Sequence, residues 1–101
     1  MKILEAEISV NFSNPGLWSD NILGRCSEEE GIVVKEGMLP DTTRSVFVHE
    51  VIHIIMKRLG TDKLIKDDSP ETLIDNLATG MVSFIKNNPE YIHWIQGGPR
   101  P

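Results

Sequence analysis

The stretch from Arg44 to Leu59, RSVFVHEVIHIIMKRL, constrains the fold more than any other part of the chain. Wound as a helix at about 100° per residue, it has apolar side chains around most of its circumference, which is typical of a helix buried on several sides. The remaining sector carries His49, Glu50, His53 and Lys57, with Val46 between them. Ionisable groups are costly to bury without partners, so the sequence predicts that something in the fold satisfies this polar sector.

Within this sector, His49, Glu50 and His53 form an H-E-x-x-H motif. Histidines four residues apart lie one above the other on a helix, so His49 and His53 can bind one Zn²⁺ at about 2.0–2.1 Å from each ring nitrogen. Glu50 projects beside the pair, where it can deprotonate the water that the metal acidifies. The motif predicts a zinc site with two histidine ligands and a glutamate base. The alternative is a metal-free pair of histidines that hydrogen-bond to carbonyl groups.

Length, charge and composition narrow the class of protein. A chain of 101 residues with 40% hydrophobic composition supports one compact domain, expected over residues 1–96, with a flexible tail at 97–101. The net charge of −5 argues against nucleic acid as a partner, because phosphate binding needs a cationic field. The sequence contains neither a long apolar run nor the features of a signal peptide. We therefore expect a cytoplasmic protein without a membrane partner.

The elements expected around the motif give an α+β fold. A small antiparallel or mixed sheet of about three strands precedes the motif helix, and a second helix packs on it. Asp41–Thr43 supplies the N-cap candidates of the motif helix and Gly60 ends it. The other elements are a strand over Lys2–Phe12 broken at Asn14–Gly16, a hairpin of Ile22–Cys26 and Gly31–Glu36 around Ser27–Glu30, a loop over Thr61–Asp68, a helix over Glu71–Asn87 capped by Ser69, and a short helical segment over Glu90–Gln96.

The second helix has a broad apolar face in the sequence. We expect Phe84 at the margin of this face, which consists of Leu73, Ile74, Leu77, Ala78, Met81, Val82 and Ile85. Cys26 is the only cysteine, which excludes an internal disulfide, and we interpret it as an inert strand residue.

A catalytic zinc usually takes three protein ligands, and the third must come from outside the motif helix. Met56 and Leu59 stand where a metzincin would need Gly and His, so that class is excluded. Glu71, Asp75 and His93 are the candidates. Glu71 falls within the apolar arc of the second helix, which favours it over Asp75, although helix-dipole stabilisation alone would also explain an acid in a first turn.

The motif His49–His53, the strand Gly31–Gly37 and the segment from Glu71 to Trp94 resemble the small phage- and prophage-encoded zincin-like metallopeptidases related to the ImmA/IrrE group. The resemblance implies a minimal zincin fold, in which an edge strand receives an extended peptide and the helix after the motif gives an acidic ligand. In those relatives the acid lies in an E-x-E-A-N-x-F-A-like stretch. Glu71 matches its first acid, whereas the second falls on Leu73.

The leading functional hypothesis is a zinc-dependent peptidase that acts on a peptide or protein substrate. A zinc-bound water attacks the scissile bond, and Glu50 is the general base. Tyr91 or His93 is expected either to assist at the oxyanion or simply to pack in the fold. The alternative is a non-catalytic accessory protein of phage origin that keeps the zincin fold with a structural metal.

Overall fold

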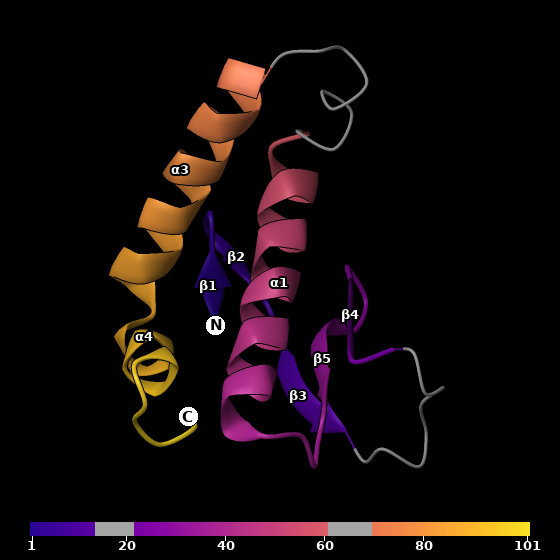
Figure 1. Ribbon diagram of the computed structural model, residues 1–101. Coiled ribbons are helices and arrows are strands. Elements are labelled where there is room, and N and C mark those ends of the chain that lie inside the picture. The colour runs from indigo at the N-terminus through magenta and orange to yellow at the C-terminus, as the bar shows by residue number, and fades with distance from the viewer. Residues whose placement is uncertain (14–21, 61–69) are drawn as a thin grey trace.

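The computed structural model describes residues 1–13, 22–60 and 70–101 (Figure 1). The predicted break at Asn14–Gly16, the loop over Thr61–Asp68 and the N-cap at Ser69 lie outside the described residues. Figure 1 shows the strands β3, β4 and β5 on one side of α1 and the helix α3 on the other, with the short strands β1 and β2 drawn between α3 and α1. This arrangement agrees with the predicted α+β class.

A three-stranded mixed sheet lies on one side of α1. Strand β5 (Gly31–Lys35) is central and pairs in parallel with β3 (Val10–Ser13) and antiparallel with β4 (Gly24–Ser27). The β4–β5 hairpin turns where the sequence predicted it, and the Glu30 backbone N–H donates to the Ser27 hydroxyl across the turn at 3.0 Å. The centre of β5 is buried, as expected of a strand covered by a helix.

The prediction of one strand over Lys2–Phe12 is wrong. The segment divides into β1 (Lys2–Ile3), β2 (Ala6–Glu7) and β3, and the first two strands pair as a separate small hairpin. Leu4 and Glu5 turn the chain with φ values of 49° and 69°. Such turns usually carry Asn or Gly, so a Leu-Glu pair gives no sequence signal for one.

Helix α1 (Pro40–Arg58) carries the motif. It starts earlier than predicted, since Pro40 occupies the first turn and Leu39 is the N-cap residue without a side-chain cap, so the proposal of an N-cap within Asp41–Thr43 is wrong. The Thr43 hydroxyl instead donates to the Leu39 carbonyl at 3.1 Å. The predicted stop is confirmed, because Gly60 adopts φ +67° and donates its N–H to the Lys57 carbonyl.

Helices α3 (Pro70–Asn87) and α4 (Pro89–Ile95) follow close to the predicted bounds. Helix α3 runs antiparallel to α1 (Figure 1) and packs tightly against it at Gly80, where a Cβ atom would overlap Cγ2 of Ile55. The prediction that Phe84 lies at the margin of the apolar face is wrong: Phe84 is fully buried, whereas Ile74, Val82 and Ile85 are exposed. The face that α3 buries is therefore rotated from the centre of its apolar arc.

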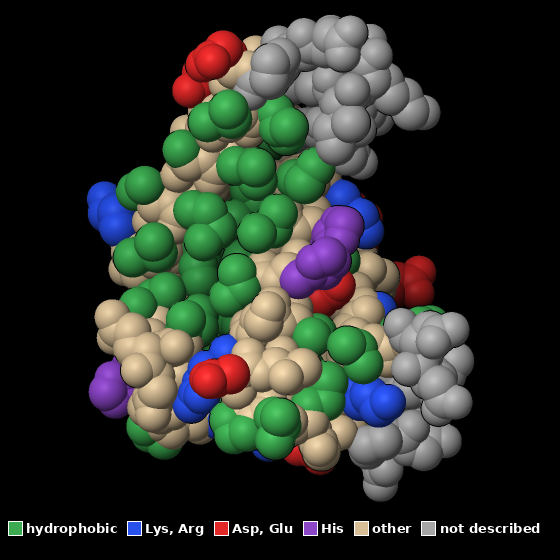
Figure 2. All heavy atoms as spheres, in the orientation of Figure 1, with side chains coloured by type: hydrophobic (Ala, Val, Ile, Leu, Met, Phe, Trp, Pro, Cys, Tyr) green, Lys and Arg blue, Asp and Glu red, His purple; other side chains and the backbone are tan. Residues whose placement is uncertain are grey.

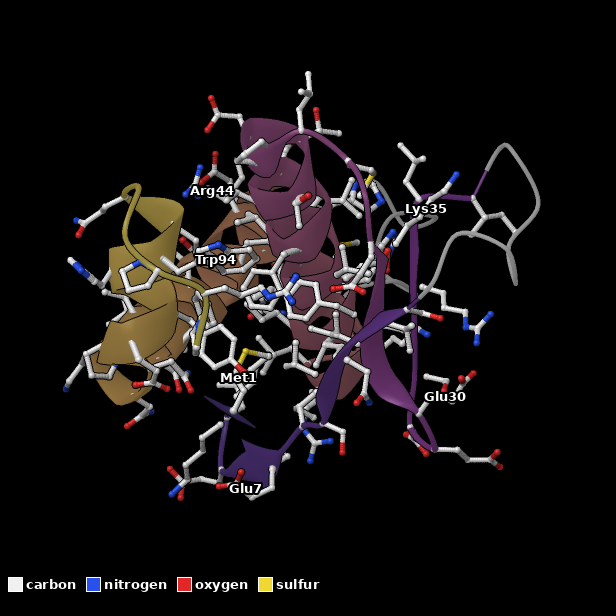
Figure 3. All side chains as sticks on the ribbon, turned by 90° about the horizontal axis from the view of Figure 1, so that it is seen from below. Met1, Glu7, Glu30, Lys35, Arg44 and Trp94 are labelled. Atoms are coloured by element: carbon white, nitrogen blue, oxygen red, sulfur yellow. The ribbon has the colours of Figure 1, made fainter. Side chains whose placement is uncertain are left out.

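The core lies between the strands and the helices and contains an aromatic cluster. Phe47 of α1 stacks on Tyr91 with ring centroids 5.3 Å apart and meets Trp94 edge-on at 5.1 Å. Figure 3 shows Trp94 between α4 and α1, and the Arg44 side chain donates to its carbonyl at 2.8 Å. This cluster joins α1 to α4.

The N-terminal hairpin is fastened to the C-terminal half by Asn88, which is 1% exposed. Its side chain accepts a hydrogen bond from the Lys2 N–H at 2.8 Å and donates to the carbonyls of Lys2 at 2.6 Å and Phe84 at 3.0 Å. After α4, Arg100 pairs with Glu36 at 3.0 Å. None of the described helices combines the length and apolar composition that crossing a bilayer requires.

Candidate metal site

The histidines of the motif converge on the exposed side of α1. The Nε2 atoms of His49 and His53 lie 3.0 Å apart, and their ligand atoms and those of Glu50 all fall within 4.8 Å of one another. The helix alone accounts for this convergence, because residues one turn apart project side by side. The His–Glu–His group is thus able to hold a metal ion.

The spacing of the two imidazoles fits a tetrahedral ion. Two nitrogens at about 2.0–2.1 Å from one tetrahedral Zn²⁺ are about 3.3 Å apart, close to the 3.0 Å between the Nε2 atoms here. The same ring nitrogen, Nε2, approaches from both histidines, and the two rings lie edge-to-face at an interplanar angle of 71°. The donor set of two imidazoles and a carboxylate suits zinc and related divalent transition metals.

Burial divides the group into two kinds of side chain. Glu50 is 5% exposed, whereas His49 and His53 are exposed. In Figure 2 two histidines adjoin at the surface with an acidic side chain beneath them, and the third histidine lies apart near the edge of the molecule. A ligand could therefore reach the histidine nitrogens from solvent, while the protein holds the carboxylate in place.

Strand β4 holds Glu50 from the side of the sheet. A Cβ atom at Gly24 would lie 2.6 Å from Val46 Cγ1 and 3.3 Å from Glu50 Cγ, so the strand approaches the helix as closely as it does because residue 24 has no side chain. Sequence analysis did not identify Gly24. The signal available was the pair of small residues, Gly24 and Cys26, on alternate positions that face α1.

The thiol of Cys26 lies beside the Glu50 carboxylate. Burial raises the pKa of the Cys26 thiol, and the charge of Glu50 and a hydrogen bond to it add to the rise, while Lys57 partly offsets it. The thiol therefore stays protonated near neutral pH and can donate to the carboxylate. Cys26 is a strand residue, as predicted, but its contact with the candidate base was not foreseen.

The outer edge of β4 borders the group. Lys35 donates its N–H to the Leu23 carbonyl at 2.9 Å, so Leu23 and, by alternation, Arg25 direct their backbone groups at β5. The backbone groups of Gly24 and Cys26 point the other way, to the side where no other described strand pairs with β4. A cleft of about 380 Å³ lies at this edge, lined by Ile22, Leu23, Gly24, Ser45, Val46, His49 and Glu50.

The candidate third ligands do not join the group. Glu71 and Asp75 are exposed in the first two turns of α3, outside the set of ligand atoms that lie within 4.8 Å of one another. Nine helical residues, about 13 Å along the axis, separate Glu71 from Gly80, whose neighbour on α1 is Ile55. Their roles as ligands stay a prediction.

The two other candidate residues lie on α4. Tyr91 stacks on Phe47 in the core, and burial together with the charge of Glu90 raises the pKa of its hydroxyl. This is the packing role that the sequence offered as one of two possibilities. His93 is exposed and, like Tyr91, is not part of the His–Glu–His group.

Comparison of the chain with protein-family models, with curated proteins and with solved structures finds no match, so what the site does is argued from its own geometry.

Proposed function

We propose that this protein is a zinc-dependent peptidase of the zincin type. The observation that carries the proposal is the 3.0 Å approach of the His49 and His53 Nε2 atoms beside a buried carboxylate. Metal-free histidines would gain one hydrogen bond from this geometry, but they would give no reason to bury Glu50 at the same point. Glu71 remains the proposed third ligand, with Asp75 as its alternative.

Glu50 acts as the general base. Zn²⁺ held by His49 and His53 would supply Lewis acidity, which would polarise the scissile carbonyl and lower the pKa of a water toward about 7. The Glu50 carboxylate accepts the proton of that water as its oxygen attacks the carbonyl carbon, and then delivers the proton to the leaving nitrogen. Gly24 and Cys26 hold the carboxylate from the sheet side and fix its orientation.

The substrate we propose is an extended peptide that pairs with the outer edge of β4. The backbone groups of Gly24 and Cys26 offer donors and acceptors there, next to Glu50. Ile22 and Leu23 line the cleft and are 46% and 40% exposed, so they favour an apolar side chain beside the scissile bond. Cys26 lies at the other end of the same edge.

The decisive experiment compares Glu50→Gln with the parent protein in zinc binding and in cleavage of a quenched fluorescent peptide library. We expect the variant to bind about one Zn²⁺ and to lose at least about 100-fold in cleavage, because the base is removed while the histidines remain. Glu7→Gln, an exposed acid on β2, is the matched control and should retain activity.

Two outcomes would contradict the proposal. Equal cleavage by Glu50→Gln and the parent would remove Glu50 from the chemistry. X-ray absorption that shows a zinc closed by four protein ligands would support the non-catalytic accessory role instead, because a catalytic site keeps a position for water.

A further inference from the structure

Helix α3 carries an apolar stripe that the fold of one chain leaves exposed. The α3 stripe consists of Ile74, Ala78, Val82 and Ile85, whose spacings of four, four and three residues place them on one helix face. Ile74, Val82 and Ile85 are 57%, 56% and 50% exposed. The face that packs on α1 is a different one, since it buries Phe84.

Large exposed apolar side chains concentrate on this helix. In the described parts of the chain they are Ile22, Leu23, Leu39, Ile74, Val82 and Ile85, so half of them belong to the α3 stripe. Figure 2 shows hydrophobic side chains gathered along α3 and across the space between α3 and α1. A contiguous apolar surface of this kind marks an interaction site more often than a scatter of single residues does.

We propose that the α3 stripe is the interface through which two copies of this chain pair, with their α3 helices antiparallel about a two-fold axis. Two charged side chains beside the stripe indicate that the partner is a second copy of the chain. Asp75 and Lys86 are eleven residues apart, which brings them within about 20° of each other around the helix and therefore onto the same flank of the stripe. Neither makes an ion pair with another described residue.

In an antiparallel pair, the two-fold axis is perpendicular to both helices. It places the same flank of the two helices side by side, with the N-terminal end of one helix beside the C-terminal end of the other. Residue 75 of one copy then faces the region of residue 86 of the other, so the dimer contains two equivalent Asp75–Lys86 ion pairs. In a parallel two-fold pair, Asp75 and Lys86 of one copy would lie on the opposite flank of the interface from those of the other copy, so no Asp75–Lys86 pair would form. Ala78 lies near the midpoint of the stripe, where a small side chain lets the two helices approach closely.

This inference does not rest on the proposed peptidase function; it assigns Asp75 to the interface, which leaves Glu71 as the proposed third ligand, and its test needs no substrate. The first measurement is sedimentation equilibrium of the parent protein over a wide concentration range, which should show a reversible monomer–dimer equilibrium. Val82→Asp should raise the dimer Kd at least about tenfold, because it places a charge in the centre of an apolar contact. Leu39→Asp is the matched control at a side chain that is 76% exposed outside the stripe, and it should leave the Kd unchanged.

Charge variants test the antiparallel geometry. Asp75→Lys and Lys86→Asp should each weaken self-association by roughly tenfold, because two exposed attractions become repulsions. Mixed in equal amounts, the two variants should associate with each other again, since one copy then carries two cations and the other two anions. The double variant Asp75→Lys/Lys86→Asp should self-associate again, because an antiparallel pair re-forms both ion pairs with their charges exchanged.

Circular dichroism on each variant shows whether the fold is retained, and far-UV spectra equal to the parent's are required before a Kd is interpreted. A parent protein that stays monomeric at the highest concentration overturns the proposal. So does a dimer that Val82→Asp leaves intact, because its interface would then lie elsewhere. A dimer that loses affinity on the double charge swap would refute the antiparallel arrangement.

Discussion

Replacing Gly80 by Ala tests how closely α3 and α1 are packed. Helix propensity alone predicts stabilisation, since Ala is favoured over Gly by about 1 kcal/mol in a helix interior. The structure predicts the opposite sign. A Cβ atom at residue 80 would overlap Cγ2 of Ile55 and would lie 3.0 Å from Cγ1 and 3.2 Å from Cβ of that side chain.

The steric cost should exceed the gain in propensity. Favourable carbon contacts lie at about 3.5–4.0 Å. Ile55 is fully buried and β-branched, so it has little freedom to move aside. Overpacking of a core costs about 1–3 kcal/mol, and the close overlap here belongs in the upper half of that range. Subtracting the propensity gain leaves a net loss of about 1–2 kcal/mol, or a fall in Tm of about 5–10 °C for a domain of this size.

The assay is urea and thermal unfolding followed by circular dichroism at a low protein concentration. Thr79 is exposed on the same helix, so the difference between Thr79→Ala and Thr79→Gly measures the propensity term without a contact. Combining Gly80→Ala with Ile55→Leu, which removes Cγ2, should recover at least about 0.5 kcal/mol relative to additivity. If Gly80→Ala stabilised the protein by as much as Thr79→Ala exceeds Thr79→Gly in stability, the close approach of the two helices would be refuted.

Three further predictions concern the site and its support. In zinc titrations of Glu71→Gln and Asp75→Asn, one variant should lose more zinc affinity than the roughly 10–100-fold effect of an outer hydrogen-bond partner, and the affinity of the other should change little. Equal small effects in both variants would mean that neither residue is the third ligand. Asn88→Ala should cost about 2–4 kcal/mol in urea unfolding, because it leaves the partly buried backbone groups of Lys2 and the buried Phe84 carbonyl without their side-chain partner, whereas exposed Asn87→Ala should cost far less. The raised pKa of Cys26 means that the unfolded thiol ionises first as the pH rises above 9.0, so stability falls there, and Cys26→Ser should reduce that fall in pH-dependent unfolding.

The sequence predicts those parts of the fold that follow from local signals. The helices over residues 40–58 and 70–87 carry periodic apolar residues, and the β4–β5 hairpin has a polar turn between two extended runs. The His49–His53 geometry is also local, because one helical turn determines it. These features need no knowledge of how distant segments meet.

The features that the sequence could not predict depend on tertiary contacts. The apolar arc of α3 is wider than the face it buries, and the pattern alone cannot say that Phe84 points inward and Val82 outward. Cys26 reaches Glu50 through the pairing of β4 and the approach at Gly24. The position of Glu71 relative to the histidines depends on the axial alignment of α3 and α1, which contacts between residues distant in the sequence determine, among them Gly80–Ile55 and Phe84–Phe47.

The hydrogen bonds between Asn88 and Lys2 bear on the order in which the protein folds. They join residues 86 positions apart, so the entropy of closing nearly the whole chain is lost before β1 is held in place. Helix α1 can form early from local interactions, yet its apolar surface stays uncovered until the C-terminal helices arrive. During synthesis residue 88 must leave the ribosome before the N-terminal hairpin can dock. We therefore expect β1 to dock only after the segment that contains Asn88 has been synthesised, and the apolar surface of the motif helix to be prone to aggregation until then.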